Sequence, residues 1–63
     1  MYYKVVITKP KGNKMSNGFS LLREAKKYAR KFSYPGDKVR IIEEYQDEIN
    51  ILYDYTVENW KIK

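Results

Sequence analysis

The apolar residues between positions 19 and 32, in the stretch FSLLREAKKYARKF, recur with the period of an α-helix. At about 3.6 residues per turn they fall within an arc of about 120°, and basic residues fill the opposite arc. The apolar stripe consists of Leu21, Leu22, Ala25, Tyr28, Ala29 and Phe32, and the basic arc consists of Arg23, Lys26, Lys27, Arg30 and Lys31. The pattern predicts an amphipathic helix over about residues 20–33, with one face suited to a core and the other almost purely cationic.

Local chemistry predicts both ends of this helix. Ser20 is the expected N-cap, because its hydroxyl can accept a hydrogen bond from the free N–H groups of the first turn. Pro35 cannot continue a helix, and residues 34–37 place Pro at the second position and Gly at the third position of a type II turn. The helix is therefore expected to end before Pro35.

Residues 2–8, YYKVVIT, are almost all aromatic or β-branched, which predicts a strand. This strand is apolar on both faces, so we expect it inside a sheet. Residues 9–12 carry Pro and Gly at the second and fourth positions, as a type I turn prefers, and a short strand is predicted around residues 14–17. The two segments predict an N-terminal hairpin.

Residues 38–45 and 49–57 predict a second hairpin, whose register can be chosen from the alternation of side chains. An odd-length loop centred on Asp47 gathers apolar residues on one face and leaves only Glu43, opposite Ile51, out of place. This register pairs Val39 with Tyr55, Arg40 with Asp54, Ile41 with Tyr53, Ile42 with Leu52, Glu44 with Asn50 and Tyr45 with Ile49. We therefore predict an odd-length loop.

Together these elements predict a single α+β domain over residues 1–63 in the order ββαββ, with the helix packed on one face of a four-stranded antiparallel sheet. The strand order 2-1-3-4 places the apolar first strand inside the sheet. Residues 58–63 either extend the last strand or fold over the sheet, since Trp60 and Ile62 alternate with polar residues.

The composition limits the chemistry that the chain can perform. Its 63 residues include no Cys and no His, so a cysteine nucleophile, a thiolate metal site and the commonest general base and metal ligand, histidine, are missing. A domain of this size buries only about 60% of the surface of its unfolded chain, which leaves little room for a deep cleft. We expect no enzyme, no cofactor and no metal site. No apolar run approaches the roughly 20 residues of a membrane span and no signal peptide follows Met1, so the cytoplasm is the expected location.

Charge is distributed unevenly along the chain, which has a net charge of +5. Residues 1–40 carry eleven Lys or Arg and two Asp or Glu, whereas residues 41–63 carry two and six. The positive half favours a polyanion, either nucleic acid or an acidic protein, as the partner. The topology brings the first turn to the C-terminal end of the helix and predicts a nucleic-acid-binding patch there. Its residues are Lys9, Lys11, Lys14, Lys27, Arg30 and Lys31, with Tyr34 as a ring for stacking. The alternative is a solvated surface that serves only solubility.

Aromatic and aliphatic residues suggest a second surface. The tyrosines predicted to face the core are Tyr28, Tyr45, Tyr53 and Tyr55, which leaves Tyr2 and Tyr34 for surface contact. The face away from the helix carries a predicted partner surface of Val6, Ile42, Leu52 and Trp60. Trp60 and Ile62 could instead cover the other three residues, and a homodimer is the further alternative.

Two function classes therefore stay open. The first is a small, non-enzymatic nucleic-acid-binding accessory protein that uses the basic patch. The second is a protein-interaction module, an inhibitor or adaptor of viral or mobile-element type, which uses the outer sheet face, an edge strand or its charged ends.

Overall fold

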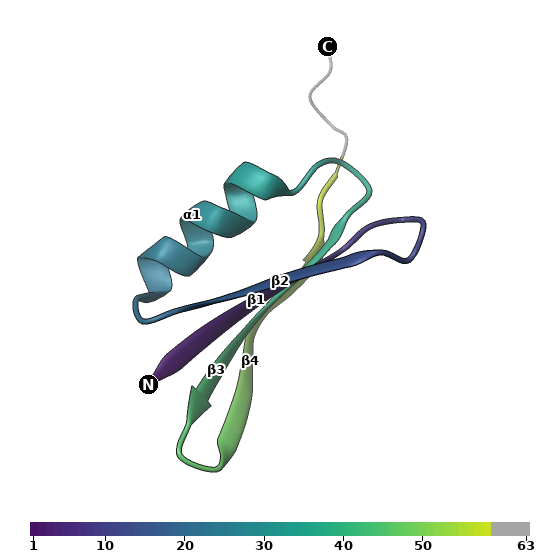
Figure 1. Ribbon diagram of the computed structural model, residues 1–63. Coiled ribbons are helices and arrows are strands. Elements are labelled where there is room, and N and C mark those ends of the chain that lie inside the picture. Colours follow the sequence, from purple (N-terminus) through teal and green to yellow (C-terminus); the bar gives the residue numbers. More distant parts are fainter. Residues whose placement is uncertain (59–63) are drawn as a thin grey trace.

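Four antiparallel strands form one open sheet, and a single helix lies across one of its faces (Figure 1). The computed structural model describes residues 1–58. Its elements are β1 (Tyr2–Thr8), β2 (Lys14–Phe19), α1 (Leu22–Phe32), β3 (Lys38–Tyr45) and β4 (Glu48–Thr56). The strand order is β2-β1-β3-β4, so the ββαββ architecture, the α+β class and the strand order are all as predicted.

The core lies between α1 and the two central strands. Its fully buried residues are Val5 and Ile7 from β1, Ala25 and Ala29 from α1, and Val39 and Ile41 from β3. Two alanines form the buried stripe of the helix, and these small side chains let its backbone approach the sheet closely. Partly buried residues, Tyr28 and Phe19 among them, pack around this centre with ring centroids 5.3 Å apart.

The helix begins at Leu22, and its N-cap is Leu21, which makes no side-chain capping hydrogen bond. The prediction of Ser20 as the N-cap is wrong by one residue. Phe19 is still paired with Tyr3 in the sheet, so only two residues turn the chain and the cap position falls on the second of them. The Leu21 carbonyl accepts hydrogen bonds from the N–H groups of Glu24 and Ala25, both at 3.2 Å.

Both predicted turns are present. Asp37 N–H donates to the Tyr34 carbonyl at 2.9 Å and Gly36 has a φ of +96°, as the type II turn requires. In the first hairpin, Gly12 N–H donates to the Lys9 carbonyl at 2.9 Å, and Gly12 has a φ of +103°. The hairpin is thus a tight turn followed by a left-handed glycine, and β2 extends to Phe19.

The second hairpin is only half as predicted. Val39 lies opposite Tyr55 and Ile41 opposite Tyr53, but a β-bulge follows, and Ile42 then lies opposite Ile51 rather than Leu52. The loop has two residues, 46 and 47, so the predicted odd length is wrong. Two-residue loops with a positive φ match the twist of the strands, and Gln46 has a φ of 55°. The extra residue is absorbed by the bulge, which the assumption of a single register could not include.

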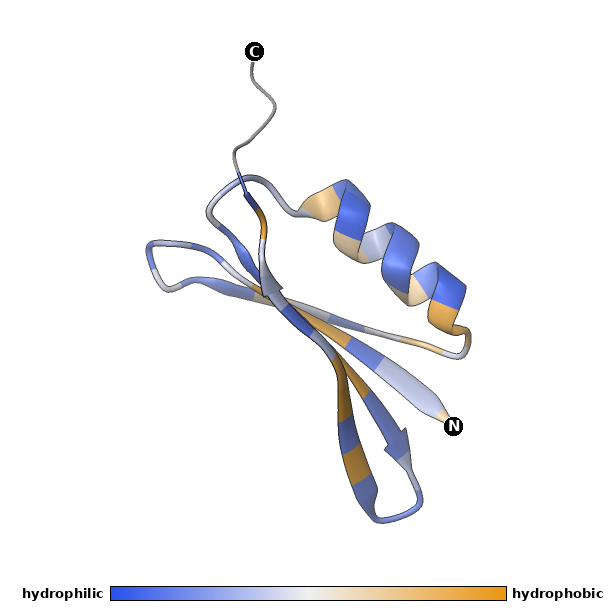
Figure 2. Ribbon diagram, turned by 180° about the vertical axis from the view of Figure 1, so that it is seen from behind, coloured by the Kyte–Doolittle hydropathy of each residue, from blue (hydrophilic) through white to orange (hydrophobic). Residues whose placement is uncertain are grey.

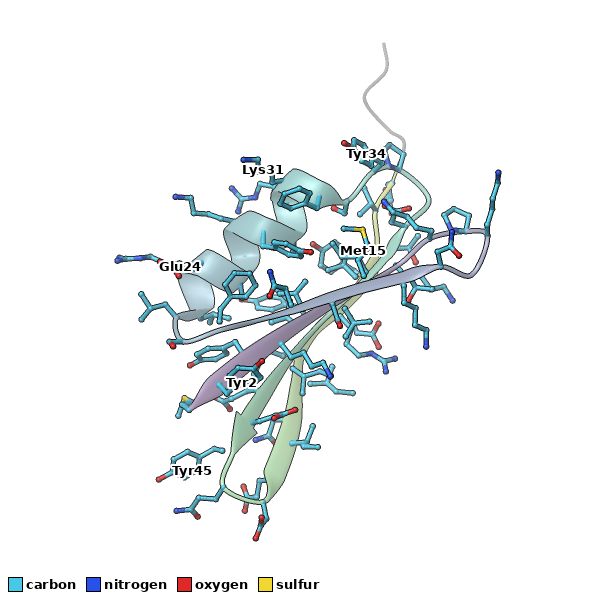
Figure 3. The ribbon with its side chains drawn as sticks, viewed as in Figure 1. Tyr2, Met15, Glu24, Lys31, Tyr34 and Tyr45 are labelled. Atoms are coloured by element: carbon cyan, nitrogen blue, oxygen red, sulfur yellow. The ribbon has the colours of Figure 1, made fainter. Side chains whose placement is uncertain are left out.

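The bulge decides which residues face away from the helix. Ile49 and Ile51 lie opposite Glu44 and Ile42, on the outer face of the sheet, and are 66% and 55% exposed. Both were expected on the inner face. Tyr45 was also predicted to face the core, but it lies beside the hairpin tip, opposite Glu48, and is exposed (Figure 3). The end of the β3–β4 hairpin therefore extends beyond the part of the sheet that α1 covers.

A pair of matched substitutions tests this division between core and surface. Ile7→Ala should lower the free energy of unfolding by about 2–5 kcal/mol, because it leaves a cavity between β1 and α1. Ile49→Ala should change it by no more than about 0.5 kcal/mol in dilute solution, where copies of the chain do not contact one another, since this side chain is exposed. Urea denaturation followed by circular dichroism measures both values.

If Ile7→Ala proves too unstable to purify, Ile41→Val gives a milder loss of about 0.5–1.5 kcal/mol at a site buried to a similar degree. Equal losses for the substitutions at Ile7 and Ile49 would contradict the described register.

Candidate functional site

The helix covers only part of the inner sheet face. Its backbone approaches β1, β2 and β3 but, within residues 1–58, not β4. A groove of about 280 Å³ lies between α1 and β4. We call it the α1–β4 groove, and its lining residues are Lys26, Ala29, Arg30, Ile41, Tyr53 and Tyr55.

Two tyrosine rings and two cations give this groove its chemistry. Tyr53 and Tyr55 face the helix side of the sheet but remain 38% and 44% exposed, because no helical residue packs over them completely. The Lys26 Nζ atom lies 5.1 Å from the centroid of the Tyr53 ring, which is a cation–π distance. Aromatic faces beside cations are the groups with which backbone-tracking proteins stack bases and contact phosphates.

The exposed back of the helix adds further positive charge. We call its exposed basic residues the helix cations; they are Arg23, Lys27, Arg30 and Lys31. The two ion pairs among residues 1–58 join Lys9 to Asp37 and Arg40 to Asp54, so neither involves the helix. Lys31 and Glu24 both point away from the sheet (Figure 3), and Glu24 is the helix's one acidic residue. The positive field of the helix is therefore largely uncompensated.

Lys9, a residue of the predicted patch, has a structural role. Its Nζ atom donates to Asp37 Oδ2 at 2.7 Å and lies 4.9 Å from the centroid of the Tyr34 ring. It also lies 3.5 Å from the Phe32 carbonyl oxygen, at the end of α1. Asp37 Oδ2 accepts a second hydrogen bond, from Tyr34 N–H, at 2.8 Å. This lysine joins the first hairpin to the helix end and the turn after it.

The predicted patch is divided by the sheet. Lys27, Arg30 and Lys31 lie on the helix, whereas Lys14 lies on the outer face. There it lines a second groove, of about 430 Å³, which we call the outer groove. Its other lining residues are Val6, Thr8, Lys38, Val39, Arg40, Ile42 and Asp54.

The remaining residues that the sequence predicted for binding lie in the first turn, beside Lys9 or on the outer side of the sheet. Lys11 is exposed in the first turn, and Tyr34 is exposed beside Lys9. Val6 and Ile42 lie on the outer side of the sheet and Leu52 lies at the bulge, and the role of these residues as a partner surface stays a prediction. Trp60 and Ile62 lie outside the described residues.

The sequence analysis predicted that Tyr53 and Tyr55 face the core, and it placed Lys26 on the basic arc of the helix without including it in the patch. A signal for their accessibility was present, because one helix is about 10 Å wide and neighbouring strands lie about 4.8 Å apart. A single helix therefore covers two or three strands, and a fourth strand at the edge keeps its inward side chains accessible.

The Lys9–Asp37 ion pair should stabilise the fold more than the Arg40–Asp54 ion pair. The side chains of the first pair are 25% and 3% exposed, and those of the second are 51% and 52% exposed. Asp37→Ala should lower the free energy of unfolding by about 1–3 kcal/mol, because it leaves two partly buried donors, Lys9 Nζ and Tyr34 N–H, without an acceptor. Asp54→Ala, the matched control, should cost less than about 1 kcal/mol. Similar losses in urea denaturation would contradict this assignment.

The pH dependence of the free energy of unfolding gives a second readout on the Asp37→Ala variant. The hydrogen bond from Lys9 is the main reason that the pKa of Asp37 lies below its ordinary value of 3.8, despite the opposing effect of burial. A lowered carboxyl pKa contributes stability that is present above the unfolded-state value and is lost as the pH falls through the folded-state value. The difference between the wild type and Asp37→Ala should therefore narrow as the pH is lowered from about 6 towards about 2.

Comparisons with known proteins assign no role to this site. No helix among the described residues is long and apolar enough to cross a membrane. No family model, curated protein or solved structure matches this chain. Its function must follow from its own residues, and the α1–β4 groove with the helix cations is the part of the described surface with the most defined chemistry.

Proposed function

We propose that this protein binds single-stranded nucleic acid through the α1–β4 groove and the helix cations, without catalysing a reaction. One observation carries the proposal: two half-exposed tyrosine rings lie directly beside a helix surface whose cations make no ion pair within residues 1–58. Arg30 belongs to both sets, since it lines the groove and is exposed on the helix.

The two sets of residues would share the work of binding. Bases stack on aromatic rings with about 1–3 kcal/mol per base, and phosphates are neutralised by Lys and Arg with release of counterions. Tyr53 and Tyr55 would take the bases, and the helix cations would take the backbone. An unpaired base can enter a groove of about 280 Å³. The bases of a duplex cannot, because they are paired and stacked in the interior of the duplex.

Binding of this kind depends little on base sequence. Among the described residues, the lining of the α1–β4 groove includes neither an amide nor a carboxylate side chain, which are the groups that recognise the edges of adenine and cytosine. Its two cations, Lys26 and Arg30, are assigned here to the phosphates. Stacking and charge neutralisation accept every base. We therefore propose an accessory protein that coats or protects single strands, and we assign it to the cytoplasm, where such strands occur.

A protein-interaction module is the second candidate function, and a separate observation favours it. Ile49 and Ile51 are exposed on the outer face of the sheet, on the side opposite to α1. Exposed apolar residues that form a group often mark a binding surface. The two candidate functions use opposite faces, so each can be tested without disturbing the other.

Two double charge reversals test nucleic-acid binding. The variants Lys27→Glu/Arg30→Glu and Lys11→Glu/Lys14→Glu both lower the net charge from +5 by four units, to +1. Only the first removes helix cations. Fluorescence anisotropy with a labelled oligothymidylate of about 12 nucleotides gives Kd across a salt series for each protein.

The wild type should bind with an affinity that falls linearly on a log–log plot against salt. Loss of two phosphate contacts should reduce that slope by about 1.4 in Lys27→Glu/Arg30→Glu, and the control pair should keep most of the slope. A duplex of equal length should bind more weakly. A Kd insensitive to salt, or equal effects of the two variants, would refute the proposal.

A further inference from the structure

The outer face of the sheet carries a group of apolar side chains that nothing in residues 1–58 covers. Ile42 and Ile51 lie opposite each other on β3 and β4, and Ile49 and Leu52 flank them on β4. Ile49, Ile51 and Leu52 are all exposed, and Figure 2 shows hydrophobic bands on β4 towards the hairpin tip. We call these four residues the outer apolar group.

The charges around the outer apolar group are arranged symmetrically. Arg40, Ile42 and Glu44 follow one another at every second position of β3, so they point to the same face. A two-fold axis through Ile42, running across the strands, places Arg40 of one copy over Glu44 of the other. The same rotation places Ile42 against Ile42, with Ile51 alongside. Arg40 also pairs with Asp54 of its own chain at 3.2 Å, but its side chain is 51% exposed and stays accessible to Glu44 of the other copy. This row of β3 is therefore complementary to itself, as a two-fold interface requires.

The same symmetry brings opposite ends of the molecule together. The outer groove, which contains Lys14, Lys38 and Arg40, lies on the basic side of Ile42. The hairpin tip, with Asp47, lies on the acidic side. Rotation about Ile42 puts the acidic tip of each copy over the outer groove of the other. The same rotation sets Lys4, which lies beside Ile42 on β1, over Lys4 of the other copy, and these long side chains must extend their ammonium groups away from each other.

We propose that two copies of this protein pack through the outer faces of their sheets, with the end of each β3–β4 hairpin seated in the outer groove of the partner. A stable dimer buries about 800 Å² per copy, about one sixth of the 4876 Å² accessible surface. One face of a four-stranded sheet can supply that area. The result is a sandwich of two sheets with a helix on each outside layer, which leaves both α1–β4 grooves accessible. The inference does not depend on nucleic-acid binding.

Pairing of two β4 edges is the competing arrangement. The β-bulge, where the register shifts between Ile41 and Ile42, interrupts the alternation of side chains along β4. Odd-numbered residues of β4 therefore face one side of the sheet before the bulge and the other side after it. Tyr53 and Tyr55 face the helix side, whereas Ile49 and Ile51 face outward. A symmetric pairing of the whole edge would therefore set outward residues against inward ones, which favours packing through the faces.

Charge exchange across the proposed axis tests the dimer. Sedimentation equilibrium of the wild type should give a mass of about 15 kDa, twice the 7.6 kDa of one chain. Arg40→Glu and Glu44→Arg should each raise the dimer Kd by about tenfold or more, because each sets like charges together. The double variant should recover most of the association. Glu43→Arg, on the helix face next to Glu44, is the matched control and should leave Kd unchanged.

Circular dichroism checks that each variant folds. A wild type that stays at 7.6 kDa at all concentrations examined would overturn the proposal. So would equal effects of the changes at Glu43 and Glu44, or a dimer that persists in both Arg40→Glu and Glu44→Arg, which would indicate edge pairing or another surface.

Discussion

The geometry of this protein depends on one constraint: a single helix of three turns must cover a sheet of four strands. The helix lies over β1 and its two neighbours, and its two buried alanines bring it close to the sheet. Six apolar residues of the described part of the chain are then buried, which is a small core. The fourth strand stays at the edge, with every residue at least partly accessible to solvent. The surfaces to which we assign binding are those that the helix cannot cover.

A second constraint separates structural charges from free ones. Asp37 is buried at the end of the type II turn, and its carboxylate needs a cation nearby. Lys9 supplies that cation, at the cost of its availability to a ligand. The helix cations have no comparable partner within residues 1–58, so their positive field acts on the solvent. The net charge alone does not show this difference, because it counts Lys9 and Arg30 equally.

The amino-acid sequence was sufficient to predict features that local pattern controls. The helix, the central position of β1 and the turn around Gly36 follow from period, apolar content and Pro–Gly chemistry. The N-cap and the second loop could not be predicted in the same way. Ser20 is not the N-cap because Phe19 is still paired in the sheet, which leaves Leu21 at the cap position. Ile49 and Ile51 face outward because of the bulge near Ile42. Both outcomes depend on how strands pair, which no local window contains.

The candidate site was predicted in part for the same reason. Lys27, Arg30 and Lys31 are on the exposed helix face because the helical period alone decides their position, whereas Tyr53 and Tyr55 are accessible only because the helix does not extend over β4.

Amide chemical shifts of the ¹⁵N-labelled protein, titrated with a single-stranded oligonucleotide, test most directly the claim that the α1–β4 groove and the helix cations bind single strands. The account predicts shifts confined to α1 and the second half of β4. Shifts confined to β2, the first turn and the outer face would contradict it.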